Sequence, residues 1–73
     1  MKQSIRSLIV EELEASGAVT VRGSAGMMKV WKDPAAVLPW VTGDGKAFSC
    51  VDTAVGHVLD AVGIYLSYEV RKD

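Results

Sequence analysis

AVTVRGSAGMMKVWK, residues 18–32, is the stretch that decides the fold. Two runs rich in apolar and β-branched residues, 18–22 and 27–32, flank the loop GSAG, whose glycines suit a hairpin. If Arg22 faces Met27, alternation separates two sets of side chains. One face then carries Val19, Val21, Met28 and Val30, and the other carries Thr20, Arg22, Met27, Lys29 and Trp31. A slip of one residue would mix these sets, so the pattern favours this register.

A helix is expected on each side of the strand-rich region. Ser4 can cap the first helix and Gly17 can end it, because glycine tolerates the left-handed conformation. The apolar stripe of this helix is Ile5, Leu8, Ile9 and Leu13. In the second helix Asp52 is the expected cap and Gly63 the expected end. Its stripe is Val55, Val58, Leu59 and Val62.

The segment between these elements predicts a short helical turn and a second hairpin. In DPAAVLP, residues 33–39, Asp33 caps a single helical turn that Pro39 ends. The strands 40–42 and 46–50 follow, joined by Asp44-Gly45 as a type I′ turn that places Val41 opposite Phe48. A three-residue loop would instead pair Trp40 with Phe48, and both registers remain open.

The end of the chain has the alternation of a strand. Its two sets are Ile64, Leu66, Tyr68 and Val70, and Tyr65, Ser67, Glu69 and Arg71. The predicted fold class is therefore α+β, with two helices packed on a small, mainly antiparallel sheet. The element order is α-β-β-(short turn)-β-β-α-β, within one compact domain spanning residues 1–73.

Composition narrows the functional classes. Eight lysines and arginines against nine aspartates and glutamates leave a net charge of -1, which argues against a protein whose main task is to coat nucleic acid. The single cysteine, Cys50, excludes an internal disulfide and is interpreted as a small buried residue. Without a signal peptide or a long apolar run, the chain is expected in a reducing cytoplasm, with no membrane partner.

No motif predicts catalysis. His57 is interpreted as a solvated helix histidine, GDG at 43–45 as a turn, and EELE at 11–14 as a solvated helix face. The sequence offers no nucleophile–base pair and no metal-ligand cluster. We therefore expect a protein that is not an enzyme and uses no metal, cofactor or small-molecule substrate.

The first hairpin is the candidate partner-binding surface. From Ala15 to Lys32 the chain has no acidic residue, and the candidate residues are Arg22, Met27, Lys29, Trp31 and Lys32. Tryptophan, methionine and arginine are enriched at protein interfaces. Two alternatives remain open: Trp31 packs in the core, or hairpin 18–32 binds nucleic acid through phosphate contacts and stacking. Trp40, after Pro39, is expected at a corner of the core.

The whole chain, with the helix KQSIRSLIVEELEASG followed by AVTVRGSAGMMKVWKD, resembles the small phage-encoded regulators that bind host RNA polymerase. The resemblance implies a non-enzymatic factor that inhibits transcription initiation and promotes antitermination in the bacterial host. It also implies contact with the large polymerase subunits near the RNA exit channel. It assigns no individual residues.

Overall fold

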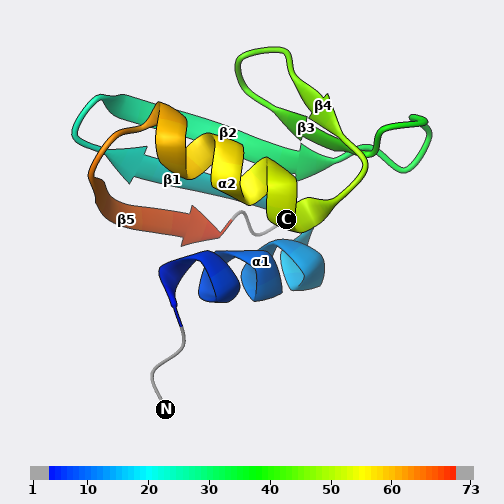
Figure 1. Cartoon of the computed structure of the whole chain (residues 1–73). Coiled ribbons are helices and arrows are strands. Elements are labelled where there is room, and N and C mark those ends of the chain that lie inside the picture. Colours follow the sequence, from blue (N-terminus) through cyan, green and yellow to red (C-terminus); the bar gives the residue numbers. More distant parts are fainter. Residues whose placement is uncertain (1–3, 71–73) are drawn as a thin grey trace.

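The computed structural model describes residues 4–70, so Arg71, the last residue of the predicted final strand, lies outside the described residues. Two helices and five strands follow one another along the chain (Figure 1). They are α1 (Ile5–Ser16), β1 (Ala18–Gly23), β2 (Gly26–Lys32), β3 (Trp40–Thr42), β4 (Ala47–Phe48), α2 (Val51–Ala61) and β5 (Tyr65–Val70). The predicted α+β class is confirmed.

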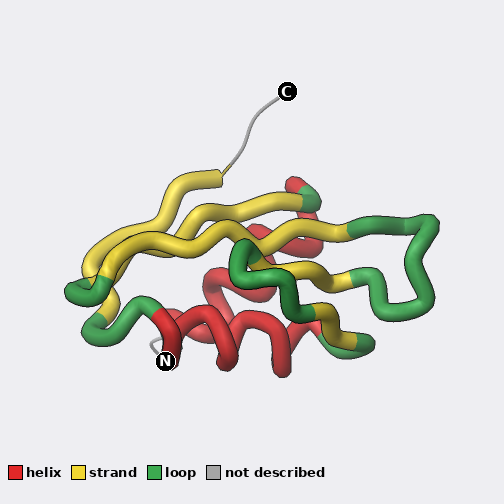
Figure 2. The backbone as a smooth tube through the Cα atoms, turned by 90° about the horizontal axis from the view of Figure 1, so that it is seen from above, coloured by secondary structure: helices red, strands yellow, loops and turns green. Residues whose placement is uncertain are grey.

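The strands form one sheet in the order β4-β3-β2-β1-β5, and every neighbouring pair is antiparallel. Both helices lie on the same side of this sheet, and within residues 4–70 no other element covers its opposite face (Figure 2). The core lies between these two layers. Its buried side chains are Ile9, Leu13, Val19, Val21, Val30, Trp40, Ala54, Val55, Val58 and Val62.

The register of the first hairpin is the predicted one, with Arg22 opposite Met27. The loop is shorter than expected, because Gly23 pairs with Gly26 and leaves only Ser24 and Ala25 in the turn. This turn bonds to the connection between α2 and β5: the Ser24 amide donates to the Ile64 carbonyl at 2.9 Å. At Gly23 the backbones come so close that a Cβ atom would lie 2.3 Å from the Val62 carbonyl oxygen.

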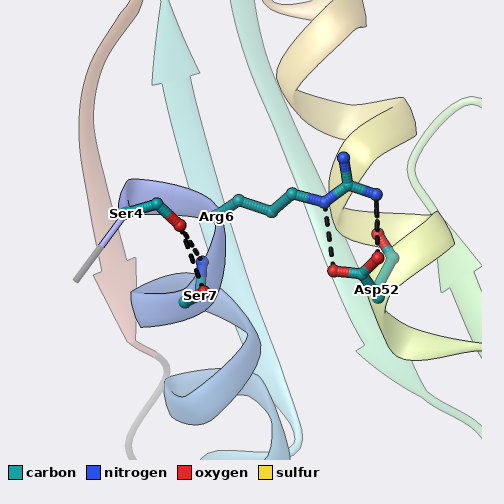
Figure 3. Close-up of polar contacts among 4 residues, drawn as sticks. All are labelled: Ser4, Arg6, Ser7 and Asp52. Carbon is teal, nitrogen blue, oxygen red and sulfur yellow. Dashed lines mark hydrogen bonds and ion pairs between the residues drawn. The ribbon is translucent and has the colours of Figure 1, made fainter.

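Helix α1 begins and ends as predicted. The Ser4 hydroxyl accepts a hydrogen bond from the Ser7 amide at 3.2 Å (Figure 3). Gly17 adopts a φ of 84° and donates its amide to the Leu13 carbonyl at 2.8 Å. These bonds satisfy main-chain groups that a helix end would otherwise leave without partners.

Helix α2 begins differently from the prediction. Cys50 is the N-cap and makes no side-chain cap bond, so the assignment of Asp52 as the cap was wrong. Asp52 lies in the first turn, where its carboxylate accepts hydrogen bonds from Nε and Nη2 of Arg6, both at 3.0 Å (Figure 3). The bidentate geometry of a guanidinium and a carboxylate favours this contact over capping and ties α1 to α2.

Two other expectations need correction, and one choice that the sequence left open is decided. Residues 33–39 form an irregular loop with a β-turn and no helical turn. In the second hairpin Trp40 pairs with Phe48, and Gly45 adopts a φ of 86°, so the three-residue loop is the observed one. In β5 a bulge interrupts the alternation between Ser67, which pairs with Arg22, and Tyr65, which pairs with Gly23. The face therefore switches before Ser67, so that Tyr65 packs on the core while Ile64 and Leu66 are exposed.

Candidate partner-binding surface

Four of the five predicted partner-binding residues share the sheet face that no helix covers. Trp31, Lys29 and Met27 of β2 pair with Ala18, Thr20 and Arg22 of β1, respectively. These positions alternate with Val19, Val21 and Val30, which are fully buried beneath the helices. We call Arg22, Met27, Lys29 and Trp31 the open-face cluster.

Lys32 does not belong to this cluster. It pairs with the buried Trp40, and its Nζ lies 5.6 Å from the centroid of the Trp40 ring. Alternation along β2 places Lys32 on the other face from Trp31, at the end of the strand. The prediction that Lys32 shares one surface with Trp31 was therefore wrong, and the alternation within the hairpin already separates the two residues.

The two tryptophans have different environments. Trp40 is 8% exposed and belongs to the core, as expected. Trp31 is half-buried and lies outside the core, between Ala18 on β1 and Val41 on β3. Nζ of Lys29 lies 5.4 Å from the centroid of the Trp31 ring, which is cation–π geometry. The alternative that Trp31 packs under a helix is thereby excluded.

Strand β5 adds residues to this surface that the sequence alone did not place there. Glu69 pairs with Thr20, and Ser67 pairs with Arg22, so β5 continues the same face beside β1. Leu66, at the bulge, is 62% exposed, and Met27 is 58% exposed. The face therefore contains two cations, one carboxylate and exposed aliphatic side chains, so it is amphipathic and only weakly basic.

A second polar arrangement joins the β3–β4 loop to α2. Nε2 of His57 lies 2.6 Å from Oδ2 of Asp44, and the Thr42 hydroxyl donates to the same carboxylate. The hydrogen bond from Thr42 and then that from His57 lower the pKa of Asp44 to about 2. The ring of His57 also contacts that of Phe48 at 5.2 Å between centroids. The turn assigned to GDG is confirmed, whereas His57, which was interpreted as a solvated helix histidine, is half-buried and bonded to Asp44.

This arrangement ties the β3–β4 loop to α2. The hydroxyl and the imidazole both bond to the carboxylate rather than to each other, so His57 is not placed to take a proton from Thr42. A cleft of about 530 Å³ opens next to His57. Its lining residues are Arg6, Phe48, Thr53, Gly56, His57, Leu59 and Asp60. Arg6 and His57 are already paired with Asp52 and Asp44, so the cleft presents no free cation from these two residues.

Cys50 is exposed rather than buried, because it lies at the start of α2. The main-chain amides of Thr53 and Asp52 at the start of α2 lower the pKa of its thiol. Within residues 4–70, no group of three or more histidine, cysteine, aspartate and glutamate side chains is placed to hold a metal ion. Neither helix in this part of the chain is long and apolar enough to cross a bilayer.

Comparisons with known proteins give no relative. No protein-family model, no curated protein and no solved structure matches this chain.

Proposed function

We propose that this chain is a non-enzymatic regulator that binds another protein through the open-face cluster. The observation that carries the proposal is the position of Trp31, which lies on the sheet face without helices and outside the core. Tryptophan, arginine and methionine are among the residue types enriched in protein interfaces. Here Arg22 and Met27 accompany Trp31 on a rigid sheet.

The proposed partner is bacterial RNA polymerase, at its large subunits. This step comes from the resemblance of the whole chain to phage regulators that bind the host enzyme. A small factor of this kind inhibits initiation or promotes antitermination by binding one state of the polymerase more tightly than another. The site of action would then be the cytoplasm of the bacterial host.

A nucleic-acid partner is less well supported by the open face. The ammonium group of Lys29 lies over the Trp31 ring, so it competes with a base for that ring face. Glu69 adds a carboxylate to the face through its pairing with Thr20. The net charge of the chain is -1, so it provides little of the positive charge that neutralises phosphates when a protein binds nucleic acid. Direct contact with RNA or DNA would therefore be secondary to protein binding.

The proposal is tested by titrating purified bacterial RNA polymerase with the wild type and with Arg22→Glu/Lys29→Glu. We expect the double variant to bind at least about tenfold more weakly, because two interface cations become carboxylates. Lys46→Glu is the control, since it reverses an exposed lysine in the β3–β4 loop. Wild-type protein that fails to bind polymerase would rule out the proposed target. Salt-sensitive binding to RNA with no binding to polymerase would support the nucleic-acid reading instead.

A further inference from the structure

The loop between β2 and β3 contains a run of six residues without a single polar side chain, four of which are exposed. This loop, Pro-Ala-Ala-Val-Leu-Pro at 34–39, projects beyond the ends of the strands (the green loop at the right of Figure 1). Val37 is 97% exposed and Leu38 is 43% exposed. Neither side chain belongs to the core or packs against it. Adjacent apolar side chains that stay exposed contribute little to the stability of the fold, and they indicate an interaction with another molecule.

The loop is held in one shape by its own hydrogen bonds. The Asp33 amide donates to the Pro39 carbonyl at 2.6 Å and closes the loop at its base. The Asp33 carboxylate accepts the Ala35 amide, and the Asp33 carbonyl accepts the Ala36 amide, both at 3.1 Å. The two prolines also restrict the backbone. Val37 and Leu38 are thus presented by a preformed loop, which lowers the entropy lost on binding.

We propose that loop 34–39 is an apolar anchor that inserts Val37 and Leu38 into an apolar pocket of a partner protein. The loop between β2 and β3 begins at Asp33, two residues after Trp31, so it lies at the end of β2 next to a member of the open-face cluster. This inference deepens the proposed function and rests on it for the identity of the partner. The open-face cluster would contact the surface of the partner, and the loop would enter its pocket.

The charges around the loop define the kind of pocket. Lys32 precedes the loop with an exposed side chain, and Lys29 is the next cation along β2. The one acid at the loop, Asp33, uses its carboxylate within the loop itself. A complementary pocket therefore has an apolar floor and carboxylates on the rim nearest Lys32.

Two other occupants fit less well. Two aliphatic side chains bury less apolar surface than one myristoyl chain, which by itself binds membranes only marginally, so a bilayer is not the partner. A second copy of the chain would have to offer an apolar pocket. The cleft on the helix side is lined in part by the polar side chains of Arg6, His57 and Asp60, so it does not suit the aliphatic side chains of the loop.

The experiment compares Val37→Ser/Leu38→Ser with the wild type in titrations of purified bacterial RNA polymerase. Because both side chains are exposed, the variant should keep the wild-type melting temperature, while its affinity falls by at least about tenfold. Ala35→Ser, which adds one hydroxyl to the same loop, is the control and should change affinity less than about twofold. In parallel, the photo-cross-linker p-benzoylphenylalanine replaces Val37 or, as a control, the exposed Ala15 on α1. Both proteins are irradiated in bacterial lysate.

The outcomes separate the two proposals. Weaker binding of Val37→Ser/Leu38→Ser, with a cross-linked adduct at position 37 that excess wild type removes, supports both. If Arg22→Glu/Lys29→Glu loses binding while the loop variant keeps it, the anchor is overturned and the proposed function stands. If polymerase does not bind, but another protein is cross-linked at position 37 and binds the loop variant more weakly than the wild type, the anchor stands and only polymerase is ruled out as the partner. No binding, and no adduct at position 37 beyond that at Ala15, overturns both.

Discussion

Nε2 of His57 lies 2.6 Å from Oδ2 of Asp44, so the β3–β4 loop is attached to α2 through a side-chain pair. Asp44 lies in a three-residue loop and His57 lies thirteen positions later in a helix. The same carboxylate also accepts the Lys46 amide at 3.3 Å and the hydroxyl of the buried Thr42. Asp44 is therefore the point at which the loop, the sheet and α2 are joined.

Asp44→Asn should destabilise the protein in a pH-dependent way. The pKa of Asp44 is lowered from 3.8 to about 2, first by Thr42 and then by His57. A carboxyl with a lowered pKa stabilises the fold above its ordinary pKa, and this contribution is lost as the pH falls through the folded-state value. The melting-temperature gap between wild type and variant should therefore be largest near about pH 5, above both pKa values, and should close as the pH falls towards about 2.

The matched control for this prediction is the His57→Ala background. There Asp44→Asn removes one fewer interaction, so the effects of the two substitutions should not add. Thermal unfolding of the four proteins of this cycle, from about pH 2 to about pH 5, measures both effects. A gap that does not change with pH would contradict the assigned pKa.

Gly23→Ala should destabilise the protein because it affects the contact between the first hairpin and the α2–β5 connection. The added Cβ would lie 2.3 Å from the Val62 carbonyl oxygen and 2.9 Å from that of Ile64. Main-chain atoms cannot move aside as a flexible side chain can, so we expect a loss of about 1–3 kcal/mol in the free energy of unfolding. Urea unfolding measures it, and Gly43→Ala, whose nearest neighbours lie at 3.5 Å, should change stability by less than about 0.5 kcal/mol.

The fold could be predicted where it depends on neighbouring residues. Ser4 and Gly17 mark the ends of α1 by local hydrogen bonds, and the alternation around Arg22 and Met27 determines the hairpin register. The position of β5 beside β1 depends on contacts between residues about 40 positions apart, such as those of Ser24 with Ile64. No local pattern encodes such a contact, so the β5 bulge and its exposed Leu66 could not be predicted.

The same limit applies to the candidate surface. The period of two within β2 was enough to group Met27, Lys29 and Trp31 on one face. The same period places Lys32 on the opposite face, and only the contact of Lys32 with the Trp40 ring depends on the pairing of β2 with β3. Glu69 lies on this face only because β5 pairs with β1. The sequence of the hairpin does not include this carboxylate, so the hairpin alone predicts a more basic surface than the one observed.

Gly56→Ala should reveal how Arg6 connects the helices. Alanine in place of a glycine inside a helix normally stabilises it by about 1 kcal/mol. Here the new Cβ would lie 2.8 Å from Nη2 of Arg6, so the guanidinium would have to shift from its position beside Asp52. Gly56→Ala should therefore stabilise the wild type less than it stabilises the Arg6→Ala variant. Chemical denaturation of the four proteins tests this, and equal gains in both backgrounds would refute the contact.

The two tryptophans should respond differently to an aqueous quencher. Trp40→Phe leaves only Trp31, which is half-buried on the open face, whereas Trp31→Phe leaves only Trp40, which is 8% exposed. Acrylamide should thus quench the first variant more strongly than the second. Lys29→Met should increase quenching further in the Trp40→Phe background, because it removes the ammonium group from the Trp31 ring, and should leave quenching in the Trp31→Phe background unchanged. Equal quenching of the two single-tryptophan proteins would mean that Trp31 is shielded in solution, and the open-face cluster would then lack its central aromatic contact.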